Sequence, residues 1–522
     1  MAELRDMVLP RQESSQSSCA WDRRMGVGFA SRIGAGRCLP IVVAAATVGK
    51  HCTSRMQPPQ LTLTSDQRNA VDGILQDIEQ PSARVVLCGY AGTGKTVTTA
   101  ALVTELRERE MKVAVATPTH KAKIQVEKAL RQRGAKGFMC ITLHAMLGLK
   151  PKINYRAGTV DFVPDFGSDN MLSRRDQEEV YDRETGEIVT RDPIDVVIVD
   201  ESSMVNEFLY ELLIKELGDR PVVFVGDDRQ LLPVKEDKVC RAFVEAQSVY
   251  RLDEVLRHDG AILNLATATR QMAVGRAQFR DAIGGGSRVT AYARRQQWMD
   301  ALLESMSSHD AMSDPDHCRA LAYTNKSVEM LNNAIHVKRY GKDAPRFVEG
   351  MTCVTVDAIP DPFGGAPLLN STMDVLVQSA EIEMFTMPHD EPSEPKWKTW
   401  LIDVEACDIE KAVAIRVLHE DEMERWKAAQ KEFADTAKSC TDSADRRGWW
   451  DAYWERSNQF GGLQPASALT IHKSQGSTFR DVFLHWDIDG WGSAPTAQQN
   501  QLAYVGITRA AESLHVIRDW KR

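Results

Sequence analysis

The chain has 522 residues, and at about 150 residues per domain this length predicts three or four folded units, with 43% hydrophobic and 26% charged residues as in globular proteins. The net charge of −9 argues against a protein that coats nucleic acid with a uniformly basic surface, while a local basic channel stays compatible with it. The ten cysteines form no C-x-x-C pair, so neither a zinc ribbon nor a redox motif is supported, and scattered thiols fit a reducing compartment. No apolar run reaches the roughly 18 residues of a membrane span.

Residues 1–58 differ in composition from the rest of the chain. They are rich in Ser, Gly and Arg, contain eight Lys and Arg against four Asp and Glu, and show no hydrophobic period. We expect a disordered extension. Two alternatives stay open: a targeting peptide, which the interspersed acidic residues disfavour, and translation from Met56, directly before the first motif.

From Leu63 onward the pattern predicts alternating helices and strands. Thr64 offers a helix N-cap. The expected elements are helix 64–78, strand 84–88, helix 97–109, strand 112–117, helix 120–133, strand 195–199, helix 208–217 and strand 222–225. Alternation of this kind predicts an α/β fold with parallel sheets and helices on both faces.

Two stretches interrupt the α/β pattern. In the first stretch, 150–192, short polar and aromatic segments predict a small β-rich insertion. The second stretch, 366–462, contains a long charged helix at 421–438 and a Trp-rich end. Strands 468–471 and 482–486 then resume the pattern. The expected domains are a first α/β domain at 59–149 and 193–260, its insertion at 150–192, a second α/β domain at 261–365 and 463–522, and its insertion at 366–462.

Residues 89–96 fit the pattern G-x-x-x-x-G-K-T between an expected strand and an expected helix. The glycines let backbone N–H groups wrap phosphates, and the helix N-terminus adds a positive dipole. Lys95 is expected to bind the β- and γ-phosphates of ATP, and the Thr96 hydroxyl to bind Mg²⁺. The nucleotide-binding residues of this phosphate loop are Gly89, Gly92, Thr93, Gly94, Lys95 and Thr96.

Two carboxylates follow the apolar strand at 196–199, Asp200 and Glu201. Taken alone, the pair would be an ordinary solvated loop. Behind a phosphate loop, Asp200 is expected to hold Mg²⁺, and Glu201 to orient or deprotonate the attacking water.

Three further polar residues are candidates to contact the γ-phosphate or to stabilise the charge of the transition state. Gln230 follows the strand at 222–225, where a polar side chain could sense the γ-phosphate. Arg257 and Arg509 are candidate arginine fingers. A Gly-Asp turn and solvated surface arginines explain these residues equally well when each is taken alone.

Taken in order, these segments resemble the motif set of superfamily 1 helicases, closest to the RecD/Dda branch and its phage Dda type. The segments are Thr64–Gln67, Gly89–Thr96, Thr117–Ala122, Ile141–Leu147, Asp200–Glu201, Gly226–Val234, Glu254–Arg257, Ala322–Lys326, Leu469–Phe479 and Val505–Ala510. The resemblance implies two RecA-like motor domains that clamp ATP between them. It also implies a pin-like insertion at 150–192 and an SH3-like insertion with a helical excursion at 366–462.

The resemblance further implies site residues. Gln67 would contact the adenine, and Gln475 and Gly476 would complete the nucleotide site from the second domain. Short polar residues would hold the DNA backbone without reading bases. The expected nucleic-acid-binding residues are Pro118, Thr119, His120, Lys121, Thr142, His144, Thr324, Asn325, Thr470, His472, Lys473 and Ser474. The hydroxyls are equally suited to cap helices or stabilise turns. His120 and His144 could equally be buried histidines with their hydrogen bonds satisfied.

Two features depart from the family pattern or stay open. Leu232 replaces a Pro of the family motif, an apolar exchange that should leave Gln230 in place. The aromatic tip of a strand-separating pin is not evident in 150–192. Phe162 and Phe166 are candidates, and packing within the insertion is the favoured role for both.

We therefore expect an ATP-dependent DNA helicase or translocase that acts in replication, recombination or repair, with 5′ to 3′ polarity by family likeness. The alternative is a DNA-stimulated ATPase that displaces bound proteins without processive unwinding. A nucleotide kinase or clamp loader would lack the second-domain segments, and a decayed motor would have lost catalytic residues. The expected cofactors are ATP and Mg²⁺. The expected partners are single-stranded and forked DNA, with single-strand-binding protein or replisome components as further candidates, for a monomer in the cytoplasm of a bacterial or phage-infected cell.

Overall fold

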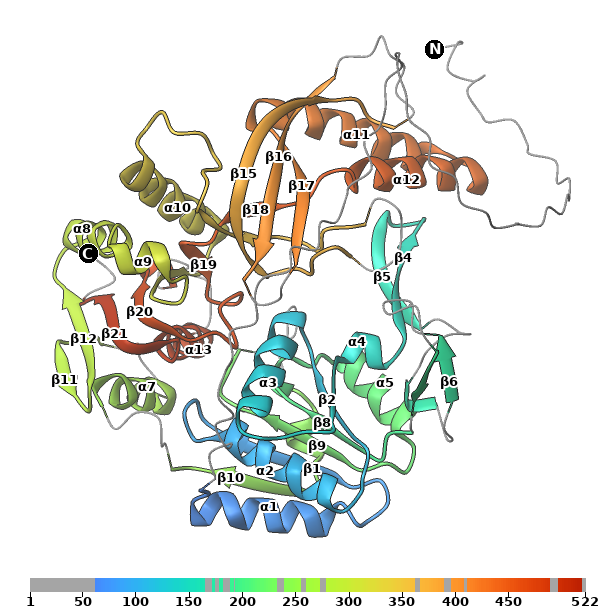
Figure 1. The fold of residues 1–522 in the computed structure, drawn as a ribbon, viewed down its shortest axis with the longest axis vertical. Coiled ribbons are helices and arrows are strands. Elements are labelled where there is room, and N and C mark those ends of the chain that lie inside the picture. Colours follow the sequence, from blue (N-terminus) through green and yellow to red (C-terminus); the bar gives the residue numbers. More distant parts are fainter. Residues whose placement is uncertain are drawn as a thin grey trace, which may run out of the picture. The chain divides into compact units, whose positions relative to one another are not determined.

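The computed structural model contains two α/β domains, each built on a six-stranded sheet (Figure 1). It describes residues 62–164, 171–173, 178–181, 188–191, 193–231, 239–254, 260–272, 278–361, 367–388, 396–407, 411–488 and 496–518. The expected extension at 1–58, Phe166, Leu232 and Arg257 lie outside these residues. No helix in the described part of the chain is both long and apolar enough to cross a bilayer.

The first domain has a fully parallel sheet in the order β10-β1-β9-β8-β2-β3. Its strands are β1 Arg84–Gly89, β2 Val113–Thr117, β3 Met139–Thr142, β8 Val196–Val199, β9 Val222–Gly226 and β10 Ser248–Leu252. Its helices are α1 Ser65–Asp77, α2 Lys95–Glu108, α3 His120–Gln132, α4 Leu143–Met146, α5 Glu207–Leu217 and α6 Ala242–Glu245, with a 3₁₀ turn at Ser202–Met204. The predicted elements of this domain are confirmed to within about two residues.

Continuous apolar runs explain why this sheet is buried on both faces. Strands β2, β8 and β9 are buried along their whole length, as expected where helices cover both sides of a parallel sheet. One core cluster joins the sheet to α1, α2 and α3, and another joins its opposite face to α4, α5 and α6. All six strands point their carboxyl ends to one edge, so the polar residues that follow β1, β8 and β9 meet there.

The second domain repeats this plan with the order β11-β12-β21-β20-β13-β19, in which only the β11–β12 pair is antiparallel. Its strands are β11 Ala282–Gly284, β12 Ser287–Tyr292, β13 Cys318–Ala322, β19 Ala468–Thr470, β20 Phe479–Leu484 and β21 Ala510–Ile517. Its helices are α7 Ala261–Gln271, α8 Arg295–Met306, α9 His309–Ser313, α10 Asn325–Tyr340 and α13 Thr496–Ile507, with a 3₁₀ turn at Trp486–Ile488. Two core clusters again cover the two faces.

The insertion in the first domain forms two antiparallel hairpins. They are β4 Leu149–Asn154 with β5 Thr159–Pro164, and β6 Glu178–Tyr181 with β7 Ile188–Arg191. A 3₁₀ turn at Met171–Ser173 lies between them in the chain. The β-rich character predicted for 150–192 is thus present.

The insertion in the second domain is larger than its predicted span of 366–462. Its antiparallel sheet has the order β17-β16-β15-β14-β18. The strands are β14 Thr352–Thr355, β15 Asp374–Phe385, β16 Trp397–Ala406, β17 Ala412–Leu418 and β18 Leu463–Pro465. Because β14 and β18 pair with each other and share one core with the remaining strands, the insertion extends beyond both predicted boundaries.

Two helices, α11 Met423–Ser439 and α12 Ser443–Ser457, follow β17 and a short 3₁₀ turn at Glu420–Glu422. They lie side by side in Figure 1, beside the insertion sheet. The predicted charged helix at 421–438 corresponds to α11, and the Trp-rich end is the separate helix α12.

Candidate nucleotide and DNA sites

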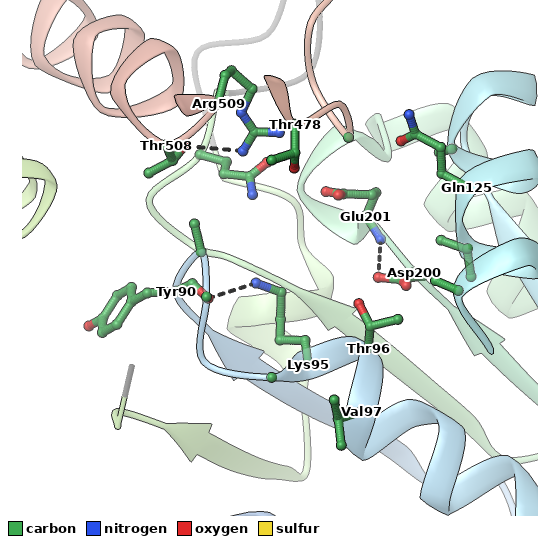
Figure 2. Close-up of a pocket in the computed structure, with 18 of the residues that line it drawn as sticks. Tyr90, Lys95, Thr96, Val97, Gln125, Asp200, Glu201, Thr478, Thr508 and Arg509 are labelled. Carbon is green, nitrogen blue, oxygen red and sulfur yellow. Dashed lines mark hydrogen bonds between the residues drawn. The ribbon is translucent and has the colours of Figure 1, made fainter. Parts of the chain in front are cut away.

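The phosphate loop joins β1 to α2, as the sequence predicts. Gly92 and Gly94 have φ of 87° and 84°, and Gly94 caps α2 in the left-handed conformation that glycine adopts without strain. Lys95 Nζ donates hydrogen bonds to the carbonyl oxygens of Gly89 at 2.7 Å and Tyr90 at 3.1 Å (Figure 2). The ammonium group therefore lies over the loop that would receive the phosphates.

The two carboxylates after β8 differ in their surroundings. Asp200 is buried, and its Oδ1 accepts a hydrogen bond from the Glu201 N–H at 2.7 Å. Burial, reinforced by the Glu201 charge and opposed in part by Lys95, raises the pKa of Asp200 to about 7.

Glu201 has a left-handed backbone with φ of 51°, a strained conformation for a residue with a side chain. Its Oε2 is buried and accepts no hydrogen bond from the part of the chain that the structure describes. A buried acceptor without a partner is costly, so strain and an unpaired oxygen at one residue point to a functional position.

These groups open into a pocket with a volume of about 340 Å³. Both motor domains contribute to its wall (Figure 2). The first domain contributes Tyr90, Ala91, Gly92, Gly94, Lys95, Thr96, Val97, Ala122, Gln125, Val126, Ala129, Arg133, Asp200, Glu201 and Gln230, and the second contributes Gly476, Thr478, Thr508 and Arg509.

Arg509 faces this pocket from the second domain. Its guanidinium donates to the carbonyl oxygens of Ser477 at 3.0 Å and Val505 at 3.2 Å, and to Thr508 Oγ1 at 3.1 Å. Hydrogen bonds within the second domain thus orient the Arg509 guanidinium. The structure thereby brings Lys95, Asp200 and Arg509 to one site.

Oxygen donors at this site suit Mg²⁺. The Asp200 carboxylate and the Thr96 hydroxyl both lie in the pocket wall, and Mg²⁺ takes such ligands with waters and substrate phosphates completing its shell. No group of three or more His, Cys, Asp or Glu in the described residues is arranged to hold a metal ion. This donor set fits a cation that arrives with the nucleotide.

Several predicted nucleotide residues lie behind the pocket rather than in its wall. Gln67 is buried, forms a capping box with Thr64 at the start of α1, and donates from Nε2 to the Thr93 carbonyl at 3.2 Å. Gln67 therefore supports the phosphate loop from behind, and its predicted contact with adenine remains a prediction. Gly89, Thr93 and Gln475 also lie outside the wall.

Gly476 does line the pocket and has φ of 80°. A Cβ added there would lie 3.0 Å from Gln125 Oε1 of the first domain, an oxygen that is buried without a hydrogen-bond partner in the described residues. The sequence motifs missed Gln125. It belongs to a stripe along α3 at helical spacing with Ala122 and Ala129, and this period was the available signal.

Three hydroxyls predicted to bind DNA act as helix N-caps in this structure. Thr119 accepts from the Ala122 N–H at 3.2 Å, Thr142 from the Ala145 N–H at 3.3 Å, and Thr324 from the Ser327 N–H at 3.2 Å. Capping hydroxyls satisfy the first backbone donors of a helix. This arrangement matches the capping alternative for these residues.

Three other predicted DNA ligands are buried. Lys121 is 6% exposed, and its Nζ pairs with Asp374 Oδ2 of the second insertion at 3.2 Å, where Arg319 also reaches Asp374 at 3.3 Å. Ser474 is fully buried and donates to the Ile471 carbonyl at 2.8 Å, and the buried Thr470 Oγ1 accepts from the Lys473 N–H. These placements differ from the prediction because the polar groups are already used within the protein.

The remaining candidates are accessible. His120 and Asn325 are exposed at the starts of α3 and α10, and Pro118 is half-buried. His472 and Lys473 are half-buried, and burial lowers the pKa of both side chains.

An aromatic pair joins α4 of the first motor domain to the first insertion. His144 and Phe162 meet edge to face with ring centroids 4.9 Å apart, and Phe162 is 48% exposed. Phe162 therefore packs on only one side, which departs from a purely packing role. Burial also lowers the pKa of His144, so its ring is neutral near pH 7.

The tip of the β4–β5 hairpin contacts helix α12 of the second insertion. Tyr155 donates to Asp451 Oδ1 at 2.7 Å, and the Arg447 guanidinium lies 5.1 Å from the Tyr155 ring centroid. A Cβ added at Gly158 would overlap the Trp450 ring, so this turn requires glycine. The two insertions thus brace each other.

Two RecA-like domains around one pocket, with a phosphate loop and carboxylates on one side and an arginine on the other, define a P-loop ATPase motor. A family model described as an AAA domain matches residues 62–297, and one described as a UvrD-like helicase C-terminal domain matches residues 465–517.

Similar proteins are helicases. The ATP-dependent DNA helicase dda of Enterobacteria phage T4 is 25% identical over 464 residues, which cover 86% of this chain and 97% of that protein. The RecBCD enzyme subunit RecD of Mycobacterium tuberculosis (strain H37Rv) is 29% identical, but over only 35% of this chain and 29% of RecD. The solved structure of Pif1 helicase from Candida albicans matches with a TM-score of 0.43 and 18% identity, covering 87% of this chain and 94% of that one. The two family models and the dda and RecD relatives together support a superfamily 1 helicase of the RecD/Dda branch.

Proposed function

We propose that this protein, an ATP-dependent DNA helicase, translocates along single-stranded DNA from 5′ to 3′ and unwinds duplex DNA at forks in replication, recombination or repair. The main support for the motor function is the pocket shared by the two domains, with Lys95 and Asp200 on one wall and Arg509 on the other. The direction of movement rests on likeness to the RecD/Dda branch.

Within this proposal, four pocket residues have separate roles in ATP hydrolysis. Lys95 leaves its loop carbonyls to bind the β- and γ-phosphates, because charged oxygens are stronger acceptors for an ammonium group than carbonyls. Glu201 orients the attacking water with its unpaired Oε2. Gln230 contacts the γ-phosphate, and Arg509 stabilises the charge that develops on it.

Magnesium would be held by Asp200 and the Thr96 hydroxyl together with the nucleotide phosphates. When bound, it neutralises charge on the phosphate oxygens. A buried Asp200 with a raised pKa is poorly solvated, and a divalent cation would restore its ionised form.

Hydrolysis becomes movement because the two walls of the pocket belong to different domains. A γ-phosphate bound by Lys95 and Arg509 holds the domains together, and its release lets them separate. DNA held by both domains would then be gripped alternately. The exposed ends of α3 and α10, with His120 and Asn325, are our candidate backbone contacts on the two domains.

Strand separation is assigned to the β4–β5 hairpin. Its exposed Phe162, packed on His144, offers a stacking surface for a base. Its tip is braced by Tyr155 on Asp451 of α12. A braced hairpin can resist the duplex while the motor domains pull the strand.

The test is directional unwinding with the full chain. Partial duplexes with only a 5′ tail or only a 3′ tail would be incubated with protein, ATP and Mg²⁺, and strand release followed by fluorescence. We expect efficient release only with the 5′ tail, and ATP hydrolysis stimulated by single-stranded DNA. Release restricted to the 3′ tail would reverse the polarity. Hydrolysis with stimulation but no release would support a protein-displacing translocase.

A further inference from the structure

Tyr504 joins the two motor domains beside the phosphate loop. It lies on α13, five residues before Arg509, and is 2% exposed. Its hydroxyl donates to Asp227 Oδ2 at 2.7 Å and accepts from the Ala91 N–H at 3.2 Å. Both partners belong to the first domain, so one hydroxyl of the second domain contacts two loops of the first.

The two contacted loops carry separate parts of the nucleotide site. Ala91 is in the phosphate loop and lines the pocket. Asp227 is fully buried directly after β9, and its Oδ1 accepts from the Arg229 N–H at 3.0 Å. Its carbonyl accepts from the Gln230 N–H at 3.2 Å, so Asp227 shapes the turn that presents Gln230 to the pocket.

The direction of these hydrogen bonds is fixed. Burial, together with the negative charge of Asp227, raises the pKa of Tyr504 far above its ordinary value, so the hydroxyl keeps its proton. It therefore donates to Asp227 and has only a lone pair for Ala91. A phenylalanine ring could fill the same space but could make neither contact.

Tyr504 and Arg509 also belong to one local element. The Thr508 N–H donates to the Tyr504 carbonyl at 3.0 Å, and Arg509 Nε donates to the Val505 carbonyl at 3.2 Å. A displacement of Tyr504 is thereby transmitted to the arginine. A second contact lies next to it, because Arg270 of α7 stacks 3.2 Å from the ring centroid of Tyr90.

We propose that Tyr504 is a positioning residue that sets the register between Arg509, the phosphate loop and Gln230 when the two motor domains meet. It does not touch the nucleotide in this role. Instead, its hydroxyl aligns the groups that stabilise the transition state, which matters because small misplacements of catalytic groups cost large factors in rate. This inference rests on the proposed function and deepens it.

The test compares Tyr504→Phe with a matched control, Tyr250→Phe, in steady-state ATP hydrolysis with and without single-stranded DNA. Tyr250 also donates to an aspartate, Asp77 Oδ2 at 2.8 Å, but both residues lie within the first domain away from the pocket. For Tyr504→Phe we expect the DNA-stimulated kcat to fall about ten- to a hundredfold, the scale of a lost hydrogen bond to a charged group, with the KM for ATP within about threefold. Tyr250→Phe should keep both values near those of the natural protein.

A second variant keeps the proposal testable if Tyr504→Phe folds poorly. Asp227→Asn retains an oxygen that can accept from Tyr504, so its kcat should fall less, and the double variant should fall no further than Tyr504→Phe alone. Full DNA-stimulated kcat in Tyr504→Phe would overturn the proposal, as would an equal loss in Tyr250→Phe or a change confined to KM. If the natural protein itself showed no stimulation by DNA, the proposed function would fail instead.

Discussion

Polar residues in the nucleotide pocket and polar residues assigned to DNA use their hydrogen-bonding groups differently. In the pocket, Glu201 Oε2 and Gln125 Oε1 are buried with no partner among the described residues. On the DNA side, the hydroxyls of Thr119, Thr142 and Thr324 are each occupied by a backbone N–H of their own helix. An unpaired buried group costs about 1–3 kcal/mol, so it persists where a ligand repays that cost, whereas a capped helix needs no ligand.

The largest effect is expected from Lys95→Ala. The substitution removes the ammonium group that would leave Gly89 and Tyr90 for the phosphates, so kcat/KM for ATP should fall about 10³-fold. DNA affinity, measured by fluorescence anisotropy, should change little because Lys95 lies in the pocket. Wild-type unwinding by this variant would show that residues 89–96 are not the phosphate site.

Glu201→Gln should have the next largest effect. The amide keeps the size of the side chain but cannot accept a proton from water, so kcat should fall about 10²-fold while ATP still binds. Equilibrium binding of a fluorescent ATP analogue separates these two quantities. Loss of nucleotide binding would contradict the role given to the unpaired Oε2 of Glu201.

We expect Asp200 to make the binding of Mg²⁺ with nucleotide dependent on pH. Its pKa of about 7 in the folded protein lies above the ordinary 3.8, so the folded state holds a proton that the unfolded chain releases. The contribution of this group to stability therefore falls as pH rises between those values. Magnesium needs the ionised carboxylate. We therefore expect Mg²⁺–ADP to bind about tenfold more tightly at pH 8 than at pH 6 by calorimetry.

The control for this effect is Asp200→Asn. The variant keeps the ionisation of the nucleotide phosphates but lacks the carboxyl, so the part of the pH dependence due to Asp200 should disappear. An identical pH profile in Asp200→Asn would assign the whole dependence to the nucleotide.

The contrast between the two regions also explains what the sequence could predict. The pocket was predictable because Gly94, Lys95 and Asp200 sit at turns after buried strands, where local sequence determines both backbone and chemistry. Residues contributed by helix faces, such as Gln125 and Tyr504, depend on how domains pack, and the helical period along α3 is only a weak signal for Gln125. The salt bridge of Lys121 was not predictable for the same reason, since its partner Asp374 lies 253 residues away in the chain.

Domain boundaries followed the same rule. Regular strand–helix alternation made the elements of the first α/β domain predictable, whereas β14, which begins at Thr352 before the expected start at 366, belongs to the sheet of the second insertion. A four-residue strand in a region of mixed pattern has no period long enough to assign it. Its place became visible only through pairing with Asp374–Leu376 and Leu463–Pro465.

The smallest expected effect tests the DNA side of the comparison directly. Thr324 caps α10, and its N–H and hydroxyl also donate to Asp487 Oδ2 at 2.9 and 3.0 Å. Thr324→Ala should therefore lower the free energy of unfolding by about 1 kcal/mol, measured by urea denaturation, as loss of a helix cap does. The neighbouring Asn325 is exposed, so Asn325→Ala should leave stability unchanged and instead weaken binding of single-stranded DNA by a small factor. If Thr324→Ala weakened DNA binding at unchanged stability, the Thr324 hydroxyl would be a ligand for phosphate. A helix-capping hydrogen bond would then no longer indicate that a residue serves stability rather than DNA binding.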